Sequence, residues 1–223
     1  MEVNKNIYFI AFLITVFLFA TILIIDNTLS RSREDRVNSI LTATSSDFVE
    51  LQSFFLLVDI YKESISCDAF KVKLREMDKD LWDFGKKLDS YRVASEQFEK
   101  NPFYTQTKAV FNKNQMLYYL LLLKSKGACN TKPSIIVYFY KNSRECGLCD
   151  SQSFVLSDLK IKYGNDVSIF AFDSDIPSAS ITTLRDIYNA SSYPCVVVNG
   201  KTLCGIKSSS EIEHQLSLNE SII

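Results

Sequence analysis

The sequence has almost no net charge and only one histidine. Its 223 residues include 25 Lys and Arg and 26 Asp and Glu, which gives a formal net charge of −1. Nucleic-acid binding calls for a basic surface, so this balance gives no indication of such a partner. His214 falls on a predicted C-terminal helix and is interpreted as a surface residue. No phosphate-binding loop, paired-carboxylate signature or Ser–His constellation is present, so the sequence gives no support to those chemistries.

Charge is also missing from residues 7–25, where Thr15 and Thr21 are the only polar residues. At about 1.5 Å per residue this segment spans about 28 Å, close to the roughly 30 Å hydrocarbon thickness of a bilayer. A cleaved signal peptide usually has a shorter apolar region followed by a small-x-small site. The sequence around residues 24–28 has no such site. We therefore predict an uncleaved anchor within residues 1–30 of a single-pass membrane protein.

Two observations disagree about the side of the membrane. Lys5 precedes the span and three arginines at 31, 33 and 36 follow it, which by the positive-inside rule places the bulk of the protein in the cytoplasm. The positions of the cysteines suggest pairing, and disulfides persist in oxidising compartments. The chain has six of them: Cys67, Cys129, Cys146, Cys149, Cys195 and Cys204. We give the cysteines more weight and predict that the soluble part is extracytoplasmic.

Residues 31–130 have the apolar spacing of an antiparallel α-helical bundle. Apolar residues recur at alternating steps of four and three, which is typical of narrow coiled-coil seams. The first seam is Val37, Leu41, Thr44, Phe48, Leu51, Phe55 and Val58, and the second is Phe70, Leu74, Met77, Leu81, Phe84, Leu88, Tyr91, Ser95 and Phe98. A third helix is predicted from Phe103 to Lys126, after the turn at Asn101-Pro102. The first helix is expected to continue the membrane span as a stalk, a candidate surface for self-association.

This layout brings Cys67 and Cys129 to one pole of the bundle. Cys67 lies in the predicted link between the first two helices, and Cys129 lies just past the third, beyond Gly127. A disulfide between them would close a loop of about 62 residues and add roughly 4 kcal/mol in the chain-entropy model. Such a disulfide would be purely structural. The alternative is that they are two unrelated small apolar residues.

Cys146-Gly147-Leu148-Cys149 directly follows the apolar run at residues 135–140. We predict a helix from Cys146 to Tyr163, so that Cys146 meets the unpaired N–H groups and positive dipole of a helix N-terminus, which favour the thiolate. Cys149, one turn along, would be buried beneath it and close enough to form a disulfide. This arrangement indicates thiol–disulfide exchange.

Residues 131–223 alternate between strand and helix patterns. The expected order is strand 135–140, helix 146–163, strand 167–172, helix 180–188, strands 195–198 and 202–204, and helix 208–218. Asn199-Gly200 is a strong signal for a two-residue hairpin turn. Counting outward from this turn sets Cys195 opposite Cys204. The pair is therefore a second structural disulfide, a redox relay to Cys146, or two free buried thiols.

The order β-α-β-α-β-β-α, a Cys-x-x-Cys at the start of the first of these helices and an x-Pro before the hairpin together resemble the thioredoxin family. The resemblance covers about residues 133–219. It implies an α/β thioredoxin-like domain in which Cys146 is the nucleophilic thiol and Cys149 the resolving thiol. It also implies that Pro194 is a cis-proline that faces the pair. The implied partners are protein or small-molecule disulfides or a redox partner, and no cofactor or metal is expected.

The sequence departs from the family pattern in three ways. Glu145 precedes the pair and Gly147-Leu148 separates it, where the family commonly has an aromatic residue and Gly-Pro. The Glu145 carboxylate would oppose thiolate formation, and Arg144 would offset it. The preceding strand carries Tyr138 and Tyr140 but no buried acid, which weakens the case for thioredoxin-like reduction. The two hairpin cysteines are extra.

These observations predict a membrane-tethered thiol–disulfide oxidoreductase. Its parts are an anchor at residues 1–30, a helical stalk or bundle at 31–130 and a thioredoxin-like domain at 131–223. In a first alternative the domain is a non-catalytic interaction module, and Cys146–Cys149 is a static bridge. In a second alternative the Cys-x-x-Cys pair and the hairpin pair bind zinc or an iron–sulfur cluster, although the eight residues between the hairpin cysteines fit a metal knuckle poorly.

Overall fold

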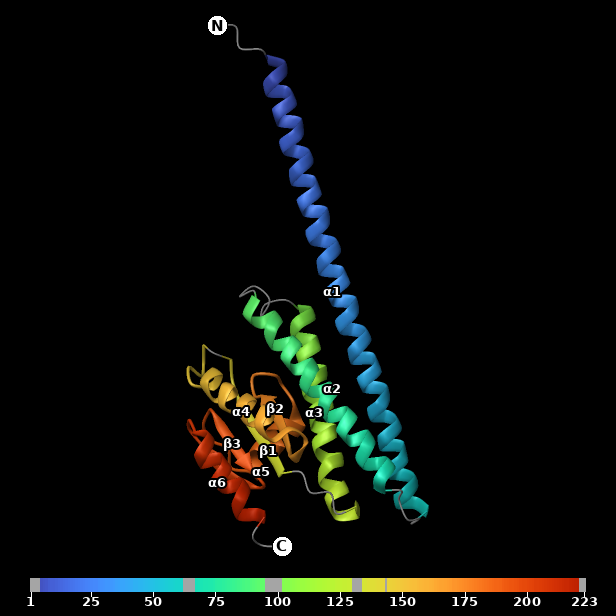
Figure 1. Ribbon diagram of the computed structural model, residues 1–223, viewed down its shortest axis with the longest axis vertical. Coiled ribbons are helices and arrows are strands. Elements are labelled where there is room, and N and C mark those ends of the chain that lie inside the picture. Colours follow the sequence, from blue (N-terminus) through green and yellow to red (C-terminus); the bar gives the residue numbers. More distant parts are fainter. Residues whose placement is uncertain (1–4, 62–66, 95–101, 130–133, 143, 221–223) are drawn as a thin grey trace. The chain divides into compact units, whose positions relative to one another are not determined.

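The computed structural model describes residues 5–61, 67–94, 102–129, 134–142 and 144–220. The chain divides into two compact units, residues 1–42 and 43–223. Helix α1 (Lys5–Tyr61) begins in the first unit and ends in the second. The second unit contains the remaining helices and a mixed four-stranded sheet (Figure 1).

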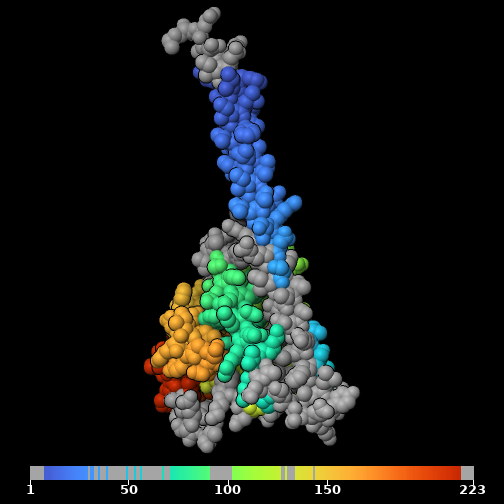
Figure 2. All heavy atoms as spheres, turned by 45° about the vertical axis from the view of Figure 1, so that its right-hand side comes forward, coloured from blue at the N-terminus to red at the C-terminus, as the bar shows by residue number. Residues whose placement is uncertain are grey.

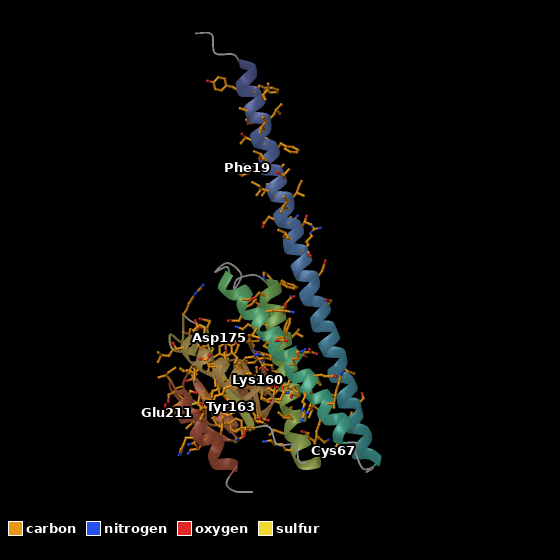
Figure 3. The ribbon with its side chains drawn as sticks, in the orientation of Figure 1. Phe19, Cys67, Lys160, Tyr163, Asp175 and Glu211 are labelled. Atoms are coloured by element: carbon orange, nitrogen blue, oxygen red, sulfur yellow. A yellow bond between two sulfur atoms is a disulfide. The ribbon has the colours of Figure 1, made fainter. Side chains whose placement is uncertain are left out.

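Within α1, Tyr8–Leu29 is long and apolar enough to cross a membrane. These 22 residues have a mean hydropathy of 2.8, and none of them is buried. Figure 2 shows their side chains, in blue, forming the surface of this segment on the side in view. Phe19, labelled in Figure 3, is 66% exposed although it is a large apolar residue. By length and composition the segment thus agrees with the predicted span at residues 7–25, and extends it to Leu29.

Helices α2 (Cys67–Ala94) and α3 (Pro102–Cys129) pack against each other. The rings of Phe84 and Phe111 meet edge to face at 5.4 Å. The described part of the second predicted seam is buried at Leu74, Met77, Leu81, Phe84 and Leu88. Its last members, Ser95 and Phe98, lie outside the described residues, as do the side chains of Phe70, Tyr91 and the whole first seam.

Two predicted boundaries in this region are wrong. Cys67 is the first residue of α2 rather than part of a link, and α3 runs through Gly127 to end at Cys129 rather than stopping before it. A glycine inside a helix costs only about 1 kcal/mol relative to alanine, so one glycine does not end a helix that other contacts support. The Cys67–Cys129 disulfide supplies such a contact, because it ties the last residue of α3 to the first residue of α2.

The sheet has the strand order β2-β1-β3-β4. Strand β1 is parallel to β2 and antiparallel to β3, and β3 is antiparallel to β4. The elements are β1 (Ser134–Tyr140), α4 (Cys149–Tyr163), the 3-10 turn η2 (Gly164–Asp166), β2 (Val167–Asp173), α5 (Ala179–Ile187), β3 (Cys195–Val198), β4 (Lys201–Cys204) and α6 (Ser209–Glu220). The predicted element order is confirmed for residues 134–220.

Local sequence explains two of these junctions. Asn199 and Gly200 both have positive φ, 48° and 93°, as a type I′ hairpin turn requires, and this turn pairs Cys195 with Cys204 as predicted. At the start of α6, the Ser208 hydroxyl accepts the Glu211 N–H at 3.3 Å, and the Glu211 carboxylate accepts the Ser208 N–H at 2.8 Å. This reciprocal capping box sets the first turn of the helix. His214, on the same helix, is exposed as predicted.

One face of the sheet forms an apolar core with α4 and α6. Its fully or nearly fully buried members are Ile136, Tyr138, Leu156, Leu159, Val167, Val196, Val198, Ile212 and Leu216. Side chains alternate between the faces of a strand, so Val196 and Val198 point toward α4 and α6. Cys195 and Val197 therefore belong to the opposite face.

The edge of the sheet at β2 is covered by side chains rather than by another strand. Gln115 of α3 accepts the Ala171 N–H through Oε1 at 2.7 Å, and Asn112 donates to the Asp173 carbonyl at 3.4 Å. On the same strand, the Lys160 ammonium donates to the Val167 carbonyl at 2.7 Å. Unpaired edge groups invite pairing with another chain, and these bonds occupy three of them.

Buried polar contacts and aromatic contacts also hold the helices to the sheet region. Lys160 and Asp78 pair at 2.5 Å with side chains only 7% and 11% exposed. Figure 3 labels Lys160, which reaches from α4 toward α2. The Tyr118 ring lies 5.3 Å from that of Phe170. Helices α2 and α3 thus form a continuous unit with the sheet.

Candidate functional site

Cys146 and Cys149 form a disulfide at the start of α4, with their Cα atoms 5.4 Å apart. The predicted helix start is wrong by three residues, because α4 begins at Cys149. Cys146 lies in the preceding turn, where its N–H donates to the Asn142 carbonyl at 2.9 Å and its own carbonyl accepts the Cys149 N–H at 3.2 Å. The helix N-terminus therefore begins at Cys149, and Cys146 sits one turn before it.

Both cysteines are buried, whereas the two residues between them are exposed to solvent. Cys146 is 5% exposed and Cys149 is 2% exposed. Gly147 is exposed, and Leu148 is 53% exposed. A partner can therefore contact the turn that joins the cysteines, and Cys146 is the cysteine nearer to solvent.

The charge next to Cys146 is balanced by a lysine that the sequence argument missed. The Lys141 ammonium donates to the Glu145 carboxylate, and this hydrogen bond is the main reason why the pKa of Lys141 is raised. Asp175 lies 3.5 Å from the same ammonium. The sequence argument named Arg144 as the residue that offsets Glu145, and the structure adds Lys141 as an ion-pair partner of this carboxylate. Their spacing of four residues and opposite charges were the available signal.

A buried tyrosine supports the first residue of α4 from below. The Tyr138 hydroxyl donates to the Cys149 carbonyl at 2.7 Å. Desolvation by burial raises the pKa of Tyr138, and the nearby Tyr140 and Asp150 raise it further. Tyr138 therefore stays neutral and keeps its proton as a donor. The strand before the cysteines thus contributes a neutral hydroxyl where the family resemblance implied a carboxylate.

The segment that carries Pro194 meets the cysteine turn through Lys141. The Tyr193–Pro194 peptide bond is cis. The Lys141 ammonium lies 5.7 Å from the centre of the Tyr193 ring, and Arg185 donates to the Tyr193 hydroxyl at 3.2 Å. Lys141 thus touches Glu145, which adjoins Cys146, and Tyr193, which adjoins Pro194. The structure brings the two predicted site segments to the same end of β1.

The hairpin cysteines, Cys195 and Cys204, form a second disulfide with their Cα atoms 3.9 Å apart. Cys195 is completely buried, and in the antiparallel pairing of β3 with β1 it lies opposite Phe139. Its side chain belongs to the sheet face opposite α4. On that same face, Thr202 donates to the Tyr188 carbonyl beyond the end of α5 at 2.6 Å. The sheet therefore separates this disulfide from the helix that carries Cys149.

The third disulfide, Cys67–Cys129, has its Cα atoms 5.5 Å apart and joins the start of α2 to the end of α3. Figure 3 labels Cys67 at this end of α2. All six cysteines are thus paired as the sequence suggested. A sulfur atom in a disulfide is not a thiolate ligand, and no group of three or more His, Cys, Asp or Glu side chains comes together among the described residues. The metal-site alternative gains no support from this arrangement.

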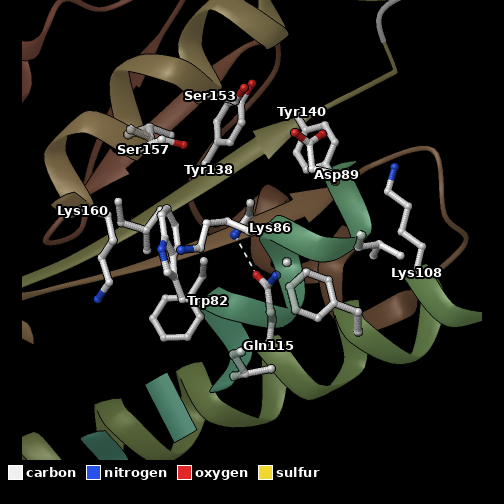
Figure 4. Close-up of a pocket in the computed structure, with 18 of the residues that line it drawn as sticks. Trp82, Lys86, Asp89, Lys108, Gln115, Tyr138, Tyr140, Ser153, Ser157 and Lys160 are labelled. Atoms are coloured by element: carbon white, nitrogen blue, oxygen red, sulfur yellow. Dashed lines mark hydrogen bonds between the residues drawn. The ribbon is translucent and has the colours of Figure 1, made fainter. Parts of the chain in front are cut away.

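Behind Cys149 lies a cavity of about 250 Å³ that the sequence did not reveal (Figure 4). Its walls come from α2, α3, β1, β2 and α4. Trp82 of α2 forms part of one wall. No local pattern signals this cavity, because its lining residues are spread from Asp78 to Ala171.

Comparisons with known proteins add little to this geometry. No family model and no curated protein matches the sequence. A solved structure described as "Structure of a malarial protein" is 19% identical, with a TM-score of 0.33, and the match covers 39% of this chain and 96% of that one. A structure of thioredoxin-2, described as a component of malaria parasite protein secretion machinery, is 21% identical, with a TM-score of 0.32 and coverage of 39% and 82%.

At these TM-scores the likeness carries no argument about activity. The class of this protein is therefore defined by the elements and disulfides of the described residues. The chain is a disulfide-containing protein with a mixed sheet, packed helices and an apolar N-terminal helix.

Proposed function

We propose that this protein is a membrane-tethered thiol–disulfide oxidoreductase with a thioredoxin-like C-terminal domain. The observation that carries the proposal is the Cys146–Cys149 disulfide at the start of α4, beside an exposed turn and the Pro194 segment. The element order of residues 134–220 supports the same domain type.

The proposed exchange has two steps. In the reduced protein the Cys146 thiolate attacks one sulfur of a substrate disulfide, forming a mixed disulfide and releasing the other sulfur as a thiolate. The Cys149 thiolate then attacks the Cys146 sulfur, and the second substrate sulfur leaves as a thiolate that takes up a proton. The protein ends as the Cys146–Cys149 disulfide, and the substrate has gained two electrons. The reverse sequence oxidises a dithiol.

Neighbouring residues have defined roles in this proposal. Lys141 neutralises Glu145, and this limits the penalty that a carboxylate places on the Cys146 thiolate. Cys149, as the first residue of α4, adjoins the unpaired N–H groups of the helix, which favour its thiolate during resolution. Pro194 would present the backbone of a substrate to Cys146.

The other two disulfides are proposed to be structural. Cys195–Cys204 lies on the sheet face away from α4, which favours a cross-link over a relay to Cys146. Cys67–Cys129 joins two helix ends. Pairing of all six cysteines supports an extracytoplasmic location for the soluble part, because disulfides persist in oxidising compartments.

The proposed parts are an anchor at residues 1–30, a helical stalk or bundle at 31–130 and the thioredoxin-like domain at 131–223. Self-association through the stalk stays a prediction.

The first test is the reduction potential of each pair in the full chain. The detergent-solubilised protein is equilibrated in glutathione buffers, its thiols are trapped with mass tags, and each cysteine is located by peptide mapping. We expect Cys146–Cys149 to be reduced reversibly between about −120 and −270 mV, the range of known exchangers. The other two pairs should stay oxidised across that range and serve as internal controls.

The same measurement separates the enzyme from its main alternative. A Cys146–Cys149 pair that stays oxidised well below about −300 mV would be a structural bridge. The protein would then be a non-catalytic interaction module, and it would show no turnover of a model disulfide.

A further inference from the structure

Seven of the residues that line the cavity behind Cys149 are aromatic. In Figure 4, Trp82 comes from α2 and two tyrosines from β1, with the side chains of α4 beyond them. These aromatic residues are Trp82, Tyr104, Phe111, Tyr118, Tyr138, Tyr140 and Phe170. Clustered aromatic faces and an interior of about 250 Å³ suit a small planar ring system, because rings stack favourably on rings.

One polar group in this wall has an unused hydrogen bond. Gln115 is 5% exposed, and its Oε1 is occupied by the Ala171 N–H at 2.7 Å. Its Nε2 amide meets no acceptor within the described part of the chain. Figure 4 shows Gln115 reaching from α3 into the space between α2 and β1, with the Oε1 bond drawn as a dashed line. The Nε2 group is therefore free to donate to an acceptor oxygen placed in the cavity.

The wall carries four lysines and three aspartates, so its formal charge is close to zero; they are Lys86, Lys108, Lys141, Lys160, Asp78, Asp89 and Asp150. Lys160 pairs with Asp78, and Lys108 pairs with Asp173 while lying 5.3 Å from the Tyr140 ring centre. Lys86 is exposed, lies 6.0 Å from the Trp82 ring centre and pairs with Asp83 at 3.2 Å. The cavity therefore does not demand a highly charged ligand, and the cations beside the rings tolerate one acidic oxygen.

We propose that this cavity binds a small planar aromatic molecule that carries a carbonyl or carboxylate oxygen. The ring lies against Trp82 and Tyr140, and the oxygen accepts a hydrogen bond from Gln115 Nε2. Cys149 is part of the wall, but binding requires no exchange at the disulfide. The proposal thus stands or falls separately from the proposed redox function.

The site is tested with the oxidised full-length protein in detergent. Trp82 is the only tryptophan of the chain, so its fluorescence reports directly on the cavity. Acetophenone and benzoate serve as probes, and ethylbenzene is the match that lacks the oxygen. We expect saturable quenching with acetophenone or benzoate, and binding of ethylbenzene that is about tenfold weaker, since each factor of ten corresponds to about one lost hydrogen bond.

The decisive variant is Gln115→Glu. It keeps an acceptor for the Ala171 N–H but replaces the Nε2 donor by a second oxygen. Binding of the oxygen-bearing probe should weaken about tenfold, whereas that of ethylbenzene should not change. Gln106→Glu makes the same substitution at an exposed position of α3 outside the cavity, and controls for added charge and for partitioning into micelles.

A second variant keeps the test decisive if Gln115→Glu does not fold. Ser157→Phe places a ring into the cavity from α4, where the serine is half-buried, and should abolish binding of all three probes. The proposal is overturned if neither acetophenone nor benzoate binds saturably. It is equally overturned if binding is unchanged in Gln115→Glu, or in Ser157→Phe when that variant is the one that folds.

Discussion

Two disulfides of this protein differ in the length of chain that they enclose. One lies at the start of α4, and the other joins the start of α2 to the end of α3. Cys146 and Cys149 are three positions apart, whereas Cys67 and Cys129 are 62 positions apart. In the chain-entropy model the short loop adds about 2 kcal/mol and the long loop about 4 kcal/mol. The short one also lies in an exposed turn. This difference supports our proposal that the first pair takes part in exchange and that the second stabilises the fold.

The largest expected effect comes from Cys146→Ser. Turnover of a model disulfide should fall to background, because Cys149 alone cannot complete two-step exchange. Stability in a denaturant titration should fall by only about 2 kcal/mol. As the partner variant, Cys149→Ser should accumulate mixed disulfides at Cys146, detectable by mass spectrometry. Full turnover in Cys146→Ser would show that exchange takes place elsewhere.

The opposite pattern is expected for the double variant Cys67→Ser/Cys129→Ser. Its free energy of unfolding should fall by about 4 kcal/mol, since the unfolded chain loses its longest cross-link. The reduction potential of Cys146–Cys149 should stay the same, because the two disulfides share no residue or turn. A shifted potential would show that the two regions are coupled and would remove the contrast between them.

The ion pair between α4 and α2 tests how firmly the two regions are joined. Lys160→Met leaves the Asp78 carboxylate buried without its cation, which should cost about 3 kcal/mol in chemical denaturation. The double variant Asp78→Leu/Lys160→Met should recover most of this loss, because two apolar side chains replace the pair. Additive losses in the double variant would mean that the two side chains do not act as a pair.

A smaller effect is expected at the base of the exchange site. Tyr138→Phe removes the hydrogen bond to the Cys149 carbonyl and should lower stability by about 1 kcal/mol. Amide hydrogen exchange should become faster in the first turn of α4 but not in α6. Equal exchange rates in the variant and the wild type would show that this bond does not hold the start of α4.

The smallest effect concerns pH and α6. Hydrogen bonds from the Ser208 N–H and hydroxyl lower the pKa of Glu211, so its folded pKa lies below its unfolded value. The stability that the ionised Glu211 contributes is fully present above its unfolded pKa, and it is lost as the pH falls through its folded pKa. Thermal unfolding between pH 6 and about pH 3 should therefore be less pH-dependent in Glu211→Gln. Identical profiles would remove the capping box as a source of acid sensitivity.

Much of the sheet region was predictable because its signals are local. The apolar run of β1 and the Asn199-Gly200 turn each need only neighbouring residues, and the turn alone aligned Cys195 with Cys204. The start of α4 was not predictable in the same way. The Asn142 carbonyl accepts backbone hydrogen bonds from Glu145 and Cys146 and so holds Cys146 in a turn. The spacing of apolar residues does not reveal such bonds. The Lys141–Glu145 ion pair had only a weak signal in the sequence, because the two residues lie in a turn, where a spacing of four does not fix their side chains on one face.

The sequence by itself determined the apolar span, the buried face of α2, the order of strands and helices along residues 134–220 and the register that sets Cys195 opposite Cys204. Each of these follows from a period, a turn or a spacing along the chain. Only the tertiary structure decided that α3 covers the β2 edge through Gln115, that Tyr138 supports Cys149, and that a cavity lies between them. Such contacts join residues that are distant in sequence, and many weak packing interactions together select them.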